Sequence, residues 1–406
     1  MPRPWLTPLL LLGQSLALGC GDAGSPAPTA PTARPEQADA ASPAARRPGE
    51  PLYGLTAEQQ ALFERGRLVF DRTFDQGTGL GPLFNATSCR ECHEDPASGG
   101  NGDEVETQVA AVLPDGICDP FTSSGGPVIQ QHATQLLQDS PLGLTSEPIP
   151  PTAPVAHRVT PNIFGFGLLD AVPDETILAL ADPDDRDGDG ISGRPNLTPD
   201  GRIGRFGRKA ATATLLEFNA GAFHNELGVT NPLFPTEGTV GPWPIPPGVD
   251  PVPDPEIDQD ALSAADAFVR FLAPPAPLVL TKQARDGQEI FSRIQCTGCH
   301  VPRLTTGESP VPAMRHRQVT AYTDLLLHDM GSAMADICTQ LASPSEFRTQ
   351  PLMGLRLQPR FLHDGRAETV EQAIEDHGGE AARARDGFLG LPEAERAALV
   401  AFLKSL

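Results

Sequence analysis

One pentapeptide pattern, Cys-x-x-Cys-His, occurs twice in this chain, at residues 89–93 and 296–300. In each copy a helical turn brings two thiols to one face, next to an imidazole. Such thiols can bond the two vinyl groups of a haem while the imidazole binds the iron. A pair of zinc half-sites would need about four ligands per ion, without a histidine directly after the second cysteine. We therefore predict two covalently bound haem c groups, held by Cys89, Cys92, His93, Cys296, Cys299 and His300.

The N-terminus has the pattern of an export signal. Arg3 is followed by an apolar run over residues 9–18 and then by Gly19 and Cys20, an order typical of secretory signal peptides. The end of this segment resembles the lipobox of bacterial lipoproteins, in which Cys20 would be acylated after cleavage. An ordinary signal peptide with an incidental cysteine is the alternative. We expect the protein on the periplasmic side of a bacterial membrane or at the cell surface, attached by a lipid anchor only.

Composition and periodicity divide the rest of the chain. After a signal peptide of residues 1–20, the segment 21–52 is dominated by Ala, Pro and Ser, which predicts a disordered tether. Beyond it, an amphipathic helix is expected before each haem motif and another at the end of each half. We expect a mainly α protein of two tandem cytochrome c-like domains with long loops, the first, with a large insertion, at 53–278 and the second at 279–406.

The charge balance limits the possible partners. The chain has 30 basic and 52 acidic residues, a net charge of −22. This argues against nucleic acid as a partner. It suits docking with a basic redox protein of the cytochrome c or cupredoxin type, although a solvated acidic surface is the alternative.

Two cysteines remain once the haem motifs and Cys20 are set aside. These are Cys118, which follows the first motif, and Cys338, which follows the second. In an oxidising compartment such a pair is expected to form a disulfide bond. The bond would join the two halves of the chain.

A short acidic segment matches the start of a calcium loop of the EF-hand type. Asp185, Asp187 and Asp189 occupy positions 1, 3 and 5, and the carbonyl of Ile191 occupies position 7. Position 12 is Asn196 in place of the bidentate glutamate. Weak calcium binding and an acidic turn without metal both fit this pattern.

The C-terminal half carries the runs LLLHDMG, EFRTQPLMGL and RFLHDGRAETVEQAIEDHGG. This pattern resembles the C-terminal haem domain of bacterial di-haem cytochrome c peroxidases. Over about residues 60–406 the chain is still more similar to the di-haem oxidoreductase-like family, often labelled thiol oxidoreductase, through FNATSCRECH, GFGLLDAVPDETILALADPDDRDGDGISGRPN and HGGEA. The resemblance implies two haems and places Arg348 and His363 in a haem pocket.

The resemblance also bears on the sixth ligand of the second iron. His377 aligns with the distal-ligand position of the peroxidases, and it shares one face of an expected helix with Val370 and Ala373. The resemblance therefore implies that His300 and His377 both bind this iron. A core histidine bonded to a carbonyl is the alternative, and Met353 is a rival ligand.

For the first iron several side chains could serve as the distal ligand, and none of them stands out, which fits an open position. Cleaving peroxide at an open iron needs a group that moves a proton between the two peroxide oxygens. Glu217 and His224, seven residues apart on one face of an expected helix, are the candidates, with simple solvated side chains as the alternative.

Together these features predict the reduction of hydrogen peroxide to water, with electrons delivered through the second haem. A non-catalytic periplasmic electron-transfer cytochrome, with both irons six-coordinate, is the main alternative. An oxidase acting on an organic or protein substrate is a further one.

Overall fold

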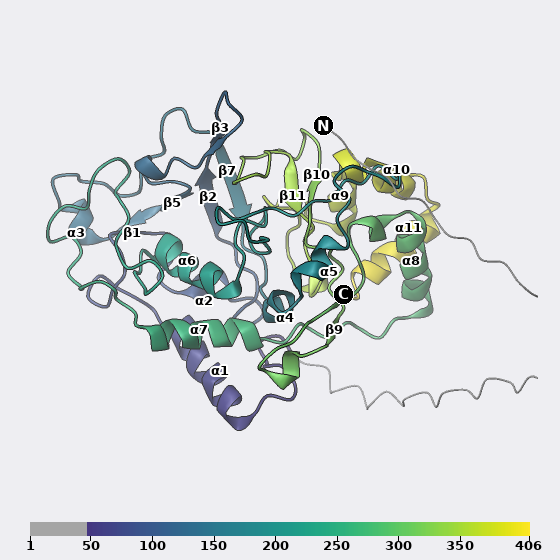
Figure 1. Cartoon of the computed structure of the whole chain (residues 1–406), viewed down its shortest axis with the longest axis horizontal. Coiled ribbons are helices and arrows are strands. Elements are labelled where there is room, and N and C mark those ends of the chain that lie inside the picture. Colours follow the sequence, from purple (N-terminus) through teal and green to yellow (C-terminus); the bar gives the residue numbers. More distant parts are fainter. Residues whose placement is uncertain (1–46) are drawn as a thin grey trace, which may run out of the picture. The chain divides into compact units, whose positions relative to one another are not determined.

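Helices make up most of the regular structure in residues 47–406, the part of the chain that the computed structural model describes (Figure 1). The predicted signal peptide, Cys20 and most of the predicted tether lie outside these residues. The helices are α1 Ala57–Phe70, α2 Cys89–Cys92, α3 Gln135–Gln138, α4 Phe166–Asp170, α5 Asp174–Leu178, α6 Leu215–Leu227, α7 Gln259–Phe271, α8 Lys282–Arg293, α9 Val370–Glu375, α10 Ala382–Leu389 and α11 Glu393–Leu403. Short 3-10 helices are η1 Thr122–Ser124, η2 Cys296–Gly298, η3 Pro312–Met314, η4 Leu355–Leu357 and η5 Gly379–Ala381. Within residues 47–406 none of these helices has the length and hydrophobicity that crossing a membrane requires.

The described residues also contain short strands that the sequence analysis did not expect. They are β1 Leu83–Phe84, β2 Val105–Val109, β3 Ala111–Val112, β4 Cys118–Asp119, β5 Val128–Ile129, β6 His132–Ala133, β7 Val155–Val159, β8 Leu304–Thr305, β9 Gln318–Val319, β10 Leu327–Asp329 and β11 Glu346–Arg348. The largest sheet has the order β5-β2-β7, is antiparallel, and pairs Thr107 with His157. The other sheets are two-stranded. All of these strands except β2 and β7 have only two or three residues, too few to show an alternating pattern, which is why they were missed.

Threonine caps begin the helix that precedes each haem motif. The Thr56 hydroxyl accepts a hydrogen bond from the Gln59 N–H (3.3 Å) at the start of α1. The Thr281 hydroxyl accepts one from the Ala284 N–H (3.1 Å) at the start of α8. These side chains satisfy backbone donors that the helix itself leaves unpaired.

The same helix pairing occurs in both halves: α1 packs on α7, and α8 packs on α11 (Figure 1). Each crossing involves a glycine. A Cβ atom on Gly66 of α1 would lie 1.9 Å from the carbonyl oxygen of Ala264, and one on Gly287 of α8 would lie 2.0 Å from that of Ala398. Any larger residue would push the helices apart, so these two glycines permit the close crossing.

One helical turn beyond each glycine, an aromatic ring lies beside the histidine of the haem motif. The ring centroid of Phe70 is 4.9 Å from that of Phe268 and 6.2 Å from that of His93. The ring of Phe291 is likewise 6.2 Å from that of His300. The helix pairs thus place both motif histidines against an aromatic wall.

The largest hydrophobic cluster contains side chains from both sides of the predicted domain boundary. Phe63 and Phe268 from the first half pack in it together with Leu325 and Met353 from the second. A separate cluster, which includes Phe291, is formed within the second half. The boundary predicted after residue 278 therefore does not separate two independent cores, because segments that follow the second motif pack on the first half.

The folded part also begins earlier than predicted. The Leu52 N–H donates to the Phe271 carbonyl (2.7 Å), and the Ala273 N–H donates to the Glu50 carbonyl (3.0 Å). Leu52 itself is buried. The tether predicted for residues 21–52 was therefore drawn too long, since its last residues form backbone hydrogen bonds with the end of α7.

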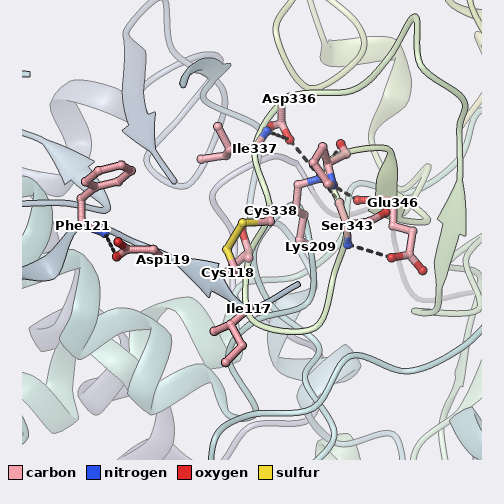
Figure 2. The surroundings of a disulfide bond; sticks show 12 residues. Ile117, Cys118, Asp119, Phe121, Lys209, Asp336, Ile337, Cys338, Ser343 and Glu346 are labelled. Carbon is pink, nitrogen blue, oxygen red and sulfur yellow. Dashed lines mark hydrogen bonds and ion pairs between the residues drawn. A yellow bond between two sulfur atoms is a disulfide. The ribbon is translucent and has the colours of Figure 1, made fainter. Parts of the chain in front are cut away.

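Cys118 and Cys338 form a disulfide bond, with an S–S distance of 2.02 Å (Figure 2). It joins β4 to the segment that follows Asp336. The Asp336 carboxylate pairs with Arg158 of β7 and with the buried Lys209, both at 2.9 Å. The Lys209 ammonium also donates to the carbonyls of Ser343, Pro344 and Glu346. A covalent bond and a buried ion network therefore fasten this segment to the first half.

Candidate functional site

Both Cys-x-x-Cys-His motifs form a tight turn that ends at the histidine. The His93 N–H donates to the Cys89 carbonyl (3.2 Å), and the His300 N–H donates to the Cys296 carbonyl (3.0 Å). None of the four motif cysteines, all within the described residues, is in a disulfide. Both thiol pairs are therefore chemically available for attachment.

Each motif histidine directs Nδ1 at a backbone carbonyl. Nδ1 of His93 is 3.0 Å from the Gly100 oxygen, and Nδ1 of His300 is 2.9 Å from the Tyr322 oxygen. Because a carbonyl only accepts hydrogen bonds, Nδ1 carries the proton and Nε2 keeps a lone pair for a metal. Burial lowers the pKa of both rings, to about 4 for His300. Both histidines are thus held in the neutral form that binds iron.

The second motif opens onto a large cavity of about 1580 Å³, which includes space that is open to solvent. Cys296, Cys299, His300 and His377 all line it. Its apolar lining includes Phe291, Leu352, Val370, Ile374, Leu399 and Leu403. Mostly apolar walls with a few convergent polar groups are typical of a cofactor site.

His377 follows α9 and has the same hydrogen-bonding pattern as the motif histidines. Its Nδ1 is 2.6 Å from the Ala373 carbonyl oxygen, so Nε2 keeps a lone pair. Burial lowers its pKa. The pKa of His300 is lowered by burial and, to a smaller extent, by His377. Met353, the rival ligand, packs in the largest hydrophobic cluster and is not among the residues that line this cavity.

Two guanidinium groups line the same cavity without a hydrogen bond to any carboxylate in the described residues. Arg348 donates to two carbonyls and to the Gln350 side chain (3.2 Å). Arg208 donates to the Val159 carbonyl (2.7 Å) and to Gln350 (3.4 Å). Burial lowers the pKa of Arg348 to about 9 and that of Arg208 to about 10. Buried cations without a counter-ion are costly, so the cavity favours an anionic occupant.

His363 lines the cavity beside these arginines. Its ring stacks on that of Phe347, with centroids 4.4 Å apart. Its Nδ1 is buried without a hydrogen-bond partner, and burial lowers its pKa to about 4. The Lys209 ammonium lies 3.8 Å from the Phe347 ring centroid. His363 therefore presents an unpaired polar atom to the cavity.

The residues around the second motif fit a haem c. Two thiols can bond its vinyl groups, and two neutral histidines offer lone pairs to its iron. The apolar walls suit the macrocycle, and the two guanidinium groups can pair with its two propionate carboxylates. No other common group uses all four of these features.

Carboxylates surround the first motif. The Glu226 carboxylate accepts a hydrogen bond from the Asn85 amide (2.8 Å). Burial raises the pKa of the Cys89 and Cys92 thiols, and nearby carboxylates, including Glu226, raise it further. Burial and the neighbouring Glu106 raise the pKa of Glu226 itself to about 8. Glu226 therefore holds a proton at neutral pH beside the first motif.

The structure places the predicted acid–base pair elsewhere. Glu217 forms an ion pair with Arg202 (2.7 Å), whose hydrogen bond lowers the pKa of that carboxyl. The His224 ring stacks on that of Phe234, at 5.3 Å. Neither side chain is among the groups that perturb the motif thiols. Glu226 is among the carboxylates that do perturb both thiols, and no local spacing in the sequence signals it.

The predicted calcium loop lies against the second motif. The loop carboxylate oxygens lie within 4.8 Å of one another, on Asp185, Asp187 and Asp189. The side chain of Ile191 packs so closely that a Cβ on Gly298 would lie 2.3 Å from its Cδ1. Asn196 is buried and donates to the Lys209 carbonyl (2.7 Å), so it does not complete the loop.

The fold and the two sites define a haem-binding redox protein. Residues 144–406, more than half of the chain, match the model of the family described as "Di-haem oxidoreductase, putative peroxidase". The chain belongs to this family and is therefore a di-haem oxidoreductase. The first motif, at 89–93, precedes the matched residues.

Several solved structures are similar over most of their length. Hydrazine synthase from Kuenenia stuttgartiensis, pressurised with xenon, shares 15% identity over 93% of this chain and 100% of its own, with a TM-score of 0.41. A MauG-like protein associated with microbial copper homeostasis shares 16% identity over 89% and 91%, with a TM-score of 0.38. The diheme peroxidase BthA from Burkholderia thailandensis E264 shares 15% over 85% and 86%, with a TM-score of 0.41. No curated protein matches this sequence.

Proposed function

We propose that this chain is an exported di-haem c-type peroxidase that reduces hydrogen peroxide to water. The reaction consumes one peroxide, two electrons and two protons and releases two water molecules. The observation that carries the proposal is the cavity of the second motif, where two thiols, two neutral histidines and two unpaired guanidinium groups meet. A haem bound there supplies an iron that exchanges single electrons.

The second site would serve electron transfer. Cys296 and Cys299 would carry thioether bonds, and His300 and His377 would bind the iron. Arg208 and Arg348 would pair with the propionates. The repeated pairing of α1 with α7 and of α8 with α11 supports the view that each half holds a cytochrome c-like unit.

The first site would receive the peroxide. His93 would be the proximal ligand, with thioether bonds at Cys89 and Cys92. Breaking the O–O bond requires a proton to move from one oxygen to the other. Glu226, whose pKa burial raises to about 8, can give its carboxyl proton to one peroxide oxygen and take up the proton of the other in exchange. The peroxide oxygen that receives the proton can then leave as neutral water.

Export and partners complete the proposal. Attachment of haem c occurs outside the cytoplasm, which agrees with the signal peptide and the lipid anchor at Cys20 that the sequence predicts. The net charge of −22 suits a basic electron donor of the cytochrome c or cupredoxin type. Asp185, Asp187, Asp189 and the Ile191 carbonyl would bind calcium weakly beside the second motif.

A single-turnover experiment tests the proposed reaction. The holoprotein is fully reduced, freed of reductant and mixed with hydrogen peroxide while both haem spectra are followed. One peroxide per protein is expected to oxidise both haems within the mixing experiment. An electron carrier with two six-coordinate irons would react with peroxide only slowly and without this stoichiometry.

Variants make the test specific for the first site. Glu226→Gln is expected to slow the oxidation by roughly 100-fold or more, the usual contribution of a proton-transfer group. Glu217→Gln is the matched control, because Glu217 lies on the same helix as Glu226 but is bound to Arg202, and it should keep the rate within about twofold. Equal rates for the two variants would contradict the role of Glu226.

A further inference from the structure

His328 is a buried histidine that faces a carboxylate with each ring nitrogen. Its Nε2 is 2.8 Å from Asp324 Oδ2, and its Nδ1 is 2.8 Å from Glu380 Oε2. The side chain is 3% exposed. Ionised carboxylates only accept hydrogen bonds, so both ring nitrogens carry a proton. The geometry therefore makes His328 an imidazolium with a full positive charge.

The ionisation of His328 agrees with its surroundings. Burial by itself lowers the pKa of this ring, but hydrogen bonds with Asp324, Cys299 and Glu380 outweigh burial and raise it to about 12. A doubly protonated ring has no lone pair. His328 is therefore not a metal ligand, although its ring, the Asp324 carboxylate and the Cys299 thiol have donor atoms within 4.8 Å of one another.

This charge lies at the wall of the second cavity. His328 lines the cavity together with Cys299, the second thiol of the motif. Glu380 lies in η5, three residues beyond His377, and also lines it. A charge in such a buried position acts on its neighbours through little water, so its field is weakly screened.

The two carboxylates are themselves held in place. Glu380 accepts hydrogen bonds from the Ser192 N–H (2.9 Å), the Ser192 hydroxyl (2.8 Å) and the Asp329 N–H (3.2 Å). The backbone of η5 lies close against β10, since a Cβ on Gly379 would be 2.0 Å from the Asp329 carbonyl oxygen. The charged ring is thus held between Asp324 and Glu380 by one hydrogen bond at each ring nitrogen.

We propose that His328 is a positioning residue whose fixed positive charge raises the reduction potential of the second haem. The inference rests on the proposed function, because it requires a haem on Cys296 and Cys299. Reduced iron carries one positive charge less than oxidised iron. A nearby cation therefore destabilises the oxidised state more than the reduced state and shifts the potential upward. Asp324 and Glu380 keep the ring charged. The charge of His328 thereby offsets part of the negative charge that Asp324 and Glu380 place beside the haem.

The charges of these three side chains predict potential shifts of opposite sign in two variants. Asp324, His328 and Glu380 together carry a net charge of −1. His328→Asn leaves −2 beside the haem and should lower its potential. Glu380→Gln leaves zero and should raise it. A purely structural role would move the potential in the same direction in both variants, because each variant disturbs the same contact between His328 and Glu380.

Spectroelectrochemical titration of the holoprotein tests this proposal. The second-haem potential is expected to fall in His328→Asn, to rise in Glu380→Gln, and to stay near wild type in His328→Lys, which keeps a positive charge. The first-haem potential should not change. His316→Asn is the control, since that histidine is exposed and pairs with Glu308 on the surface.

Two results would overturn the proposal while both haems are present: shifts of the same sign in His328→Asn and Glu380→Gln, or no shift in either. If His328→Asn does not fold, Glu380→Gln alone decides, and a lowered or unchanged potential counts against the proposal. Peptide mass spectrometry of the wild type distinguishes a failure of the proposed function from a failure of this inference. Absence of haem on Cys296 and Cys299 would contradict the proposed function and, with it, this inference.

Discussion

The two Cys-x-x-Cys-His motifs share one backbone turn but differ in the charges around them. Carboxylates such as Glu226 perturb the first motif, whereas the cavity of the second is lined by Arg208, Arg348 and His328 as well as by the carboxylates of Asp189 and Glu380. Negative surroundings stabilise an oxidised iron, and positive surroundings stabilise a reduced one. Under the proposed function, the motif itself would specify attachment, while the surrounding side chains would distinguish a site suited to peroxide from a site suited to storing an electron.

Removing the attachment thiols of one motif should give the largest effect. The double variant Cys296→Ser, Cys299→Ser is expected to lose half of the covalent haem and to leave the first haem in place. Cys89→Ser with Cys92→Ser should lose the other half. Intact-protein mass spectrometry counts the haems directly. Loss of both haems from either double variant would show that the two sites do not form independently.

The disulfide tests how strongly the two regions depend on each other. Cys118 and Cys338 are separated by 220 residues. On the loop-entropy estimate, Cys118→Ala with Cys338→Ala should lower the free energy of unfolding by about 5 kcal/mol. The measurement is denaturant unfolding without reductant, with a reduced wild type as the control. A change below about 1 kcal/mol would mean that the ion network at Asp336 holds the segment without the bond.

Replacing one guanidinium should affect only the second site. Arg348→Met removes a buried partner of a propionate and is expected to destabilise the holoprotein by about 3 kcal/mol. It should also lower the potential of the second haem. Denaturant unfolding and redox titration check both effects. If the first-haem potential shifts instead, the assignment of Arg348 to the second site is wrong.

The smallest effect concerns the carboxylate beside the first motif. Burial and Glu106 raise the pKa of Glu226 from its ordinary value of 4.5 to about 8. The folded state therefore binds this proton more tightly than the unfolded state does. The resulting stability is full below pH 4.5 and is lost as the pH rises through about 8.

Glu226→Gln should remove this pH dependence. At pH 9 the free energy of unfolding of the variant is expected to exceed that of the wild type by about 2 kcal/mol after allowance for a half-buried side chain. At pH 4 the two proteins should unfold alike. Glu217→Gln is the control, since Arg202 lowers the pKa of Glu217 and reverses the sign. A pH-independent difference would contradict the protonated state of Glu226.

Features with a local sequence signal were the ones that could be predicted. The predicted family membership is confirmed. That prediction rested on contiguous sequence motifs. The helices before and after each haem motif follow from apolar periodicity and are present as α1, α7, α8 and α11. His377 was placed by helical phase and lines the cavity.

Features that depend on contacts between distant segments were missed. Nothing near Arg208 in the sequence indicates that it meets Arg348, and Glu226 reaches the first motif only through the packing of α6. The two-residue strands carry too little pattern to be recognised. The hydrophobic cluster shared by the two halves was not predicted. The composition indicates a domain boundary near residue 278, whereas side chains from both sides of this boundary pack together.

The inequivalence of the two irons is the central claim, and low-temperature EPR spectroscopy of the oxidised holoprotein tests it most directly. The account predicts a low-spin signal from the iron between His300 and His377 and a high-spin signal from the iron at His93. Stoichiometric peroxide, added to the oxidised or the half-reduced protein, should abolish the high-spin signal. Two low-spin signals that peroxide leaves unchanged in both samples would contradict the account and identify an electron carrier.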